Sequence, residues 1–322
     1  MVLFRRLGNT IFIIFLYLCA MNERVVFRGS SLARFNDCFK SDDDCYKYIS
    51  CLKWDGEEFV CKKCGNTHYC KGHLPYSRRC TRCKHDESPT AGTMFEKLKF
   101  SVRTAFHIVF DLCRLGDGAS SSMLSKEYGI RQKTIWEFKR KIQLALNGQQ
   151  NRLLTGVVVL RSFCLTGQDD KPERKVICVA VEALGNGEIG KAYGQLMDCA
   201  SEDCILLFLE QHISVDAKVY VSEESIYSHL VTNFDIEIAE DNSLLTVCDK
   251  HLAELRSWLY GKHRRLSVEH IQGYLDEYYY RFNRRNNRAA LFDGIIGLMA
   301  RNSPLKHSKS KQKGIPDSVP VS

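Results

Sequence analysis

The sequence predicts an α/β fold in which a mixed sheet with flanking helices follows a metal-binding segment and a helical segment. Over residues 151–300, short β-branched runs alternate with stretches of helical period, which is typical of a sheet covered by helices. Over residues 36–90, two close pairs of cysteines stand where an ordinary core would have large aliphatic residues. Over residues 91–150, apolar residues recur at helix spacing. We therefore expect three successive domains.

The composition is that of a basic, folded chain with reduced thiols. The 322 residues are enough for two or three domains. Lys and Arg number 46 against 38 Asp and Glu, which gives a net charge of +8. This charge favours DNA, RNA or an anionic membrane surface, without choosing among them. The 15 cysteines are odd in number and scattered, which argues against a secreted disulfide framework and favours a cytoplasmic protein.

The N-terminal residues 1–21 form a segment of their own. Arg5 and Arg6 precede an apolar run over residues 11–20, which has the outline of a signal peptide but is too short for a membrane span. The alternative, which we favour, is an over-called start with Met21 as the true initiator. No other segment has the length and apolarity to cross a membrane, so we expect no membrane partner.

The order of strands and helices after Gly156 indicates a mixed sheet. Three strands come first, then helix and strand alternate, and helices end the region. The expected strands are residues 157–160, 176–184, 193–197, 219–221 and 236–239. The expected helices are residues 202–212, 225–232, 250–259 and 268–282. The basic, polar tail over residues 301–322 is expected to be disordered.

Two C-x2-C pairs predict a zinc ribbon. Fifteen residues separate the pairs, which consist of Cys61, Cys64, Cys80 and Cys83. A spacing of two residues lets one tight turn direct both sulfurs at the same ion, and this set matches a four-cysteine Zn²⁺ site. Metal binding would then supply folding energy that the segment cannot obtain from a core. The alternatives are chance pairing or disulfides, and His68, Cys70 and His73 are competing but less favoured ligands.

Basic side chains around the cysteines and in the helical segment are candidate DNA contacts. In the ribbon these are Lys62, Lys63 and Arg82, which either contact phosphates or form a solvated basic face. The helical segment predicts helices over residues 94–115, 120–128 and 134–146, in the outline of a helix-turn-helix. That outline places Arg131 and Lys133 at the start of a recognition helix; the alternative is a purely structural linker.

The C-terminal part carries the most specific motif. Arg256-Ser257-Trp258-Leu259-Tyr260-Gly261-Lys262-His263 is followed by Tyr274-Leu275-Asp276-Glu277-Tyr278-Tyr279-Tyr280-Arg281-Phe282-Asn283-Arg284-Arg285. This pattern resembles the signature of insertion-sequence transposases that have an N-terminal zinc ribbon and a DDE-type core. The resemblance covers most of residues 36–300 and implies an RNase H-like fold that holds two Mg²⁺ ions on three acidic or amide side chains. It also implies double-stranded DNA with terminal inverted repeats as the partner, and a homo-oligomer on that DNA.

Carried over to this chain, the resemblance implies a damaged catalytic site. The first acid, midway along the first strand, falls at Leu160, and Arg161 replaces a neighbouring acid. The second falls at Glu223 and the third at Glu254, with Arg256 in the place of a lysine. Leucine has no ligand atom, so we expect metal-dependent strand transfer to be impaired. Rescue by Asp169 or Asp170 is the alternative. Three more basic residues, Arg281, Arg284 and Arg285, are candidates for tracking the DNA backbone.

Three functions compete on these grounds. The first is a mobile-element transposase, or its decayed copy, that recognises terminal inverted repeats. The second is a non-catalytic DNA-binding regulator derived from a transposase, which differs from the first by failing to nick an end-containing duplex with Mg²⁺. The third is a zinc-ribbon scaffold for protein partners, for which binding would not weaken as salt rises.

Overall fold

The sheet lies at one end of the molecule, and its strand order is β6-β5-β4-β7-β8. The strands are β4 (Val157–Cys164), β5 (Val176–Ala183), β6 (Ile189–Met197), β7 (Lys218–Val221) and β8 (Asp235–Ile238). Strands β4, β5 and β6 are antiparallel neighbours, whereas β7 and β8 run parallel to β4. The expected mixed sheet is therefore confirmed, with longer strands at β4 and β6 than the β-branched runs alone indicated.

This computed structural model describes residues 26–29, 31–54, 58–116, 118–148, 152–165, 175–197, 201–222, 233–239, 242–262 and 267–303. Several predictions fall outside these residues. They concern the N-terminal run, Asp169, Asp170, Glu223, the helix over residues 225–232 and the tail beyond residue 303.

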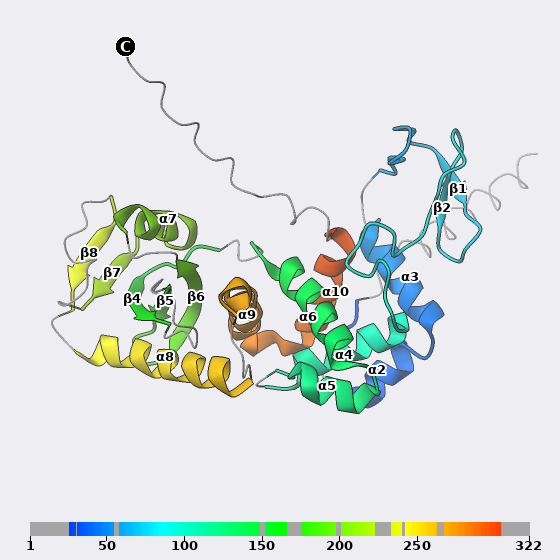
Figure 1. Cartoon of the computed structure of the whole chain (residues 1–322). Coiled ribbons are helices and arrows are strands. Elements are labelled where there is room, and N and C mark those ends of the chain that lie inside the picture. Colours follow the sequence, from blue (N-terminus) through cyan, green and yellow to red (C-terminus); the bar gives the residue numbers. More distant parts are fainter. Residues whose placement is uncertain are drawn as a thin grey trace, which may run out of the picture.

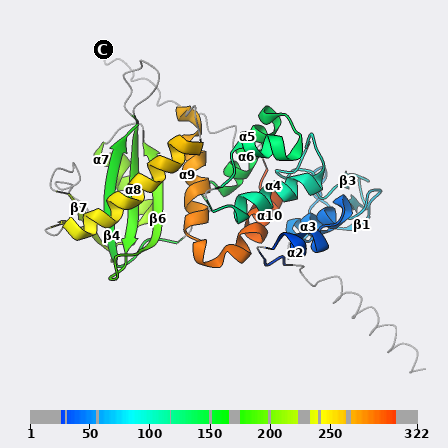
Figure 2. The same ribbon diagram turned by 90° about the horizontal axis from the view of Figure 1, so that it is seen from below.

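Helices cover both faces of the sheet (Figures 1 and 2). Alternate side chains of a strand point to opposite faces, and β4 follows this rule. Leu160 belongs to the core beneath α7 (Glu202–His212), together with Phe208. Val159 and Phe163 belong to the core beneath α8 (Asn242–Lys262). The face of β4 from which a side chain projects thus decides which helix it meets.

The other end of the molecule is helical and has its own apolar core (Figure 1). Its helices are α2 (Leu32–Cys38), α3 (Asp42–Lys53), α4 (Val102–Arg114), α5 (Ser121–Tyr128), α6 (Gln132–Leu146) and α10 (Leu291–Arg301), with a 3-10 turn at Arg285–Ala290. The helix expected from residue 94 begins only at Val102. Ser101 caps it by accepting a hydrogen bond from the Thr104 amide, and Lys97 has a left-handed backbone that a helix does not allow.

Helix α9 (Val268–Phe282) lies between the two ends and contributes to both cores (Figure 1). Tyr279 packs into the sheet core, and the next residue, Tyr280, packs into the helical core. This helix also covers the open edge of β6. The Asn283 side chain accepts a hydrogen bond from the Ala192 amide and donates one to the Ala192 carbonyl, each at 2.9 Å. The Gln272 side chain accepts another from the Leu196 amide at 2.9 Å, so the edge is blocked against further strand pairing.

The cysteine pairs lie in a small three-stranded antiparallel sheet with the order β1-β2-β3. Its strands are β1 (Tyr69–Lys71), β2 (Arg78–Cys80) and β3 (Asp86–Glu87). The buried Glu87 carboxylate joins this sheet to α3 through Lys53, whose ammonium lies 2.8 Å away. Among the described residues, no helix is long and apolar enough to cross a membrane.

Candidate functional site

The four predicted cysteines meet at one point. Their Sγ atoms all lie within 4.8 Å of one another, with Cys61 and Cys83 at 3.5 Å and Cys64 and Cys80 at 3.6 Å. A tetrahedral Zn²⁺ with Zn–S bonds of about 2.3 Å requires sulfur–sulfur distances of about 3.8 Å. The donor set therefore fits zinc in both chemistry and spacing.

Each cysteine pair is followed by the same backbone turn. Gly65 has a φ of 70° and donates its amide to the Cys61 carbonyl at 2.8 Å. Lys84 has a φ of 60° and donates to the Cys80 carbonyl at 3.1 Å. Glycine adopts this left-handed region without strain, which explains the first turn; the second repeats it with a lysine. The two turns direct two sulfurs each toward the common point.

Hydrogen bonds prepare Cys80 to bind a metal as the thiolate. Burial opposes ionisation, but the amides of Cys83 and Arg82 and the side chain of Asn66 outweigh it and lower the pKa of Cys80 to about 6. Thiolate is the form that binds zinc. The competing ligand His73 instead contacts Asp86 at 2.8 Å and Arg79 at 3.1 Å.

A short turn joins helices α5 and α6. Ser120 caps α5 by accepting from the Met123 amide at 3.1 Å, and Gly129 ends it with a φ of 63°. The Ser125 hydroxyl donates to the Ile130 carbonyl at 2.7 Å and fixes the turn. Arg131 and Lys133 are exposed at the start of α6, where side chains are able to reach DNA.

In the ribbon, the basic residues differ in their contacts. Lys62 lies 2.9 Å from Glu87 although its side chain is 59 % exposed. Lys63 and Arg82 are exposed on the turns between the cysteines. Lys63 and Arg82 thus place exposed positive charge on the same turns that hold the cysteines.

The place where β4 meets α8 holds an ion pair. The Arg161 guanidinium donates from Nε to Asp249 Oδ1 at 2.9 Å and from a terminal nitrogen to Asp249 Oδ2 at 3.0 Å. Seven residues along α8, the Arg256 guanidinium lies 4.4 Å from the centre of the Phe163 ring. Asp249 and Arg256 therefore share the face of α8 that packs on β4.

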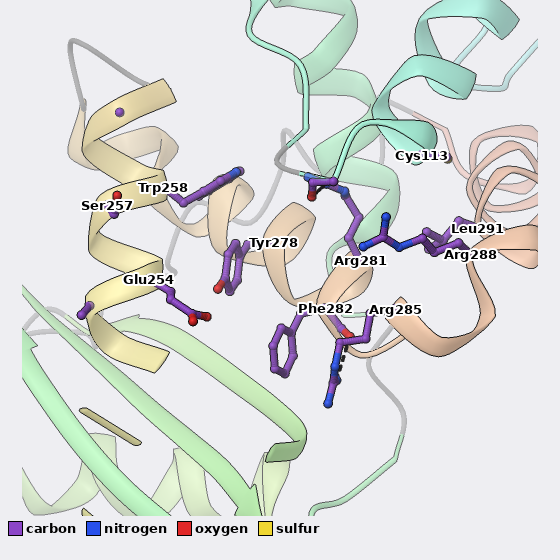
Figure 3. A pocket seen from close by; sticks show the side chains of 13 residues that line it. Cys113, Glu254, Ser257, Trp258, Tyr278, Arg281, Phe282, Arg285, Arg288 and Leu291 are labelled. Carbon is purple, nitrogen blue, oxygen red and sulfur yellow. Dashed lines mark hydrogen bonds between the residues drawn. The ribbon is translucent and has the colours of Figure 1, made fainter. Parts of the chain in front are cut away.

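Leu160 and Glu254 do not lie together. Leu160 is fully buried on the α7 face of the sheet, whereas Glu254 is an exposed residue of α8 on the other side. Five residues separate Glu254 from Asp249, which at about 100° per residue places them about 140° apart around the helix. Glu254 points instead into a hollow of about 800 Å³ between α8 and α9 (Figure 3).

This hollow is lined by residues of the motif that carried the resemblance. They include Trp258, Gly261, Tyr278, Arg281, Phe282 and Arg285 (Figure 3). The buried Arg281 donates to the carbonyls of Leu115 and Gly116, which follow α4. Arg285 donates to the Gly190 carbonyl at 2.9 Å. The arginines of the motif thus brace the helical end against the sheet.

Arg284 stacks on a ring of the preceding helix, whereas Asp249 and Asn283 make contacts that the sequence did not predict. The Arg284 guanidinium lies 3.7 Å from the centre of the Tyr280 ring. Asp249 as the partner of Arg161 was missed, although its spacing of seven residues from Arg256 was a signal that the two share a helix face. No signal in the sequence indicated that Asn283 covers the β6 edge. An asparagine after a helix is ordinarily explained as a C-terminal cap.

A mixed five-stranded sheet with helices on both faces, preceded by a four-cysteine cluster, is consistent with an RNase H-like transposase domain. Residues 162–283 match the family model of the ISXO2-like transposase domain. The match includes Asp249, Glu254 and most of the C-terminal motif, and it begins after Leu160 and Arg161. No curated protein matches the chain.

Proposed function

We propose that this protein binds the double-stranded ends of an insertion sequence through its zinc ribbon and its α5–α6 helix pair, and that its core has lost metal-dependent strand transfer. The transposase family supports DNA as the partner. The net charge of +8 favours binding to a polyanion such as DNA. As in the family, the protein would act as a homo-oligomer on paired ends.

The observation that carries the proposal is the Arg161–Asp249 pair at the junction of β4 and α8. The resemblance places the first acid of a two-metal site on this strand, next to Arg161, and a guanidinium offers donors only. Leu160 supplies no ligand atom either, and it lies on the opposite face of the sheet. The described residues therefore do not fit a pair of Mg²⁺ ions.

Binding to DNA is tested by fluorescence anisotropy with a duplex taken from the inverted repeat that flanks the gene. We expect the double variant Arg131→Ala/Lys133→Ala to bind more weakly and to lower the slope of log K against log salt by about 0.9 for each phosphate that is no longer neutralised. Lys250→Ala is the matched control, because Lys250 is an exposed lysine of α8, away from the helix pair.

The same preparation tests catalysis. Incubation of the end-containing duplex with Mg²⁺ or Mn²⁺ is expected to leave both strands intact. Metal-dependent nicking by the unaltered chain would refute the proposed loss of catalysis. Affinity that does not change between low and high salt would refute the proposed DNA interface and favour a protein-binding scaffold.

A further inference from the structure

We propose that the Arg161–Asp249 pair takes the place of the divalent ions in this core, so that a guanidinium rather than a metal joins β4 to α8. The inference deepens the proposed loss of strand transfer and rests on that assignment of the core. It makes a separate claim about which residue blocks the site: Arg161, not Leu160, is the residue that excludes the cation.

The Arg161 side chain projects from β4 toward α8. Its neighbours at odd positions on β4, Val159 and Phe163, both pack against α8. Arg161 lies between them on the same face and reaches Asp249. It also stands midway along the first strand of the sheet, next to the position of the expected first acid.

Both carboxylate oxygens of Asp249 are already bonded to Arg161. Two nitrogens of one guanidinium bond to its two carboxylate oxygens, at 2.9 and 3.0 Å. This bidentate geometry is the strongest that arginine and a carboxylate form. A cation that used Asp249 would have to displace Arg161 from both carboxylate oxygens.

The described residues around the ion pair offer no other cluster of side chains that could hold a metal ion. Within the described part of the chain, the cysteine cluster is the one group of three or more His, Cys, Asp or Glu side chains close enough to share an ion. Glu254, the other acid considered on α8, points into the hollow beside Tyr278 (Figure 3). Magnesium in proteins is held by one or two carboxylates together with waters, and both oxygens of Asp249 are already bonded to Arg161.

The two substitutions that would restore an acid on β4 should therefore behave differently. Arg161→Asp removes the guanidinium and places a carboxylate opposite Asp249. Leu160→Asp buries a carboxylate beneath α7, in a core with Phe208 and Leu209, and leaves the ion pair intact. Only the first variant should gain affinity for a divalent ion.

The experiment measures Mn²⁺ binding by electron paramagnetic resonance on the full-length, zinc-loaded chain without DNA. We expect the unaltered chain and Leu160→Asp to bind no Mn²⁺ at this site, and Arg161→Asp to gain one bound Mn²⁺ per chain, because ligand charge sets affinity for such ions. Binding by the unaltered chain that is lost in Asp249→Asn would overturn the inference, as would a gain in Leu160→Asp but not in Arg161→Asp.

A charge-swapped variant keeps the test decisive if two adjacent acids prevent folding. Arg161→Asp/Asp249→Arg retains one pair of opposite charges and should melt near the temperature of the unaltered chain without binding Mn²⁺. Binding by this swapped variant would contradict the inference, because a guanidinium would still be present. No DNA is involved, so a failure of the proposed DNA interface leaves these outcomes unaffected.

Discussion

At the scale of single residues, His251 is a buried base whose protonation opposes folding. It is 1 % exposed in α8, and its ring lies 4.6 Å from that of Phe282 and 5.8 Å from that of Tyr278. Burial, with a smaller contribution from Arg285, lowers the pKa of His251 to about 4. Between about pH 6.5 and 4 the unfolded chain therefore binds more protons at this position than the folded chain does, so acid in this window destabilises the fold.

We predict that His251→Leu makes stability less sensitive to acid. From pH 7 to pH 5, the free energy of unfolding of the unaltered chain should fall by about 1–2 kcal/mol more than that of the variant. Urea denaturation followed by circular dichroism at the two pH values measures this difference. His270→Leu is a comparison at a half-buried histidine of α9, and an equal fall in all three proteins would exclude His251 as the cause.

At the scale of secondary-structure elements, α9 acts as a cover for the β6 edge. We predict that Asn283→Ala destabilises the protein by about 1–3 kcal/mol, because it leaves the Ala192 amide and carbonyl without these partners. Hydrogen exchange should accelerate at the Ala192 amide in particular. Asn286→Ala, which removes an exposed amide in the following 3-10 turn, should leave that exchange unchanged; faster exchange in both variants would indicate general loosening instead.

The elements themselves followed from the sequence wherever a local pattern decided them. The serine and glycine around α5 and the periodicity of α6, α7 and α9 placed these helices within about two residues. The direction of β4 side chains did not follow, because Val157 to Leu160 are all apolar and a strand buried on both faces shows no alternation. For the same reason the sequence did not show that Arg161, rather than Leu160, faces α8. The pairing of Arg161 with Asp249 is seen only in the three-dimensional structure.

At the scale of the whole molecule, the chain has separate sources of stability. The sheet and the helical end are held by large apolar cores, joined through α9. Among its described residues, the ribbon has Phe59 and its cysteines as a small core, together with the Glu87–Lys53 contact to α3. Zinc binding is expected to supply most of the folding energy of the ribbon, whereas the rest of the molecule does not depend on it.

Removal of zinc should therefore unfold one part and leave the other. We predict that a chelator, or Cys80→Ser, abolishes stoichiometric zinc and weakens binding to insertion-sequence ends at least about tenfold, because phosphate contacts from Lys63 and Arg82 require ordered turns. Far-ultraviolet circular dichroism should change little, since the major helices lie outside the ribbon. Cys70→Ser is the matched control, because Cys70 is an exposed thiol of the same ribbon outside the cluster. Collapse of the helical signal would mean that the cores depend on the metal, and undiminished DNA affinity without zinc would remove the ribbon from the interface.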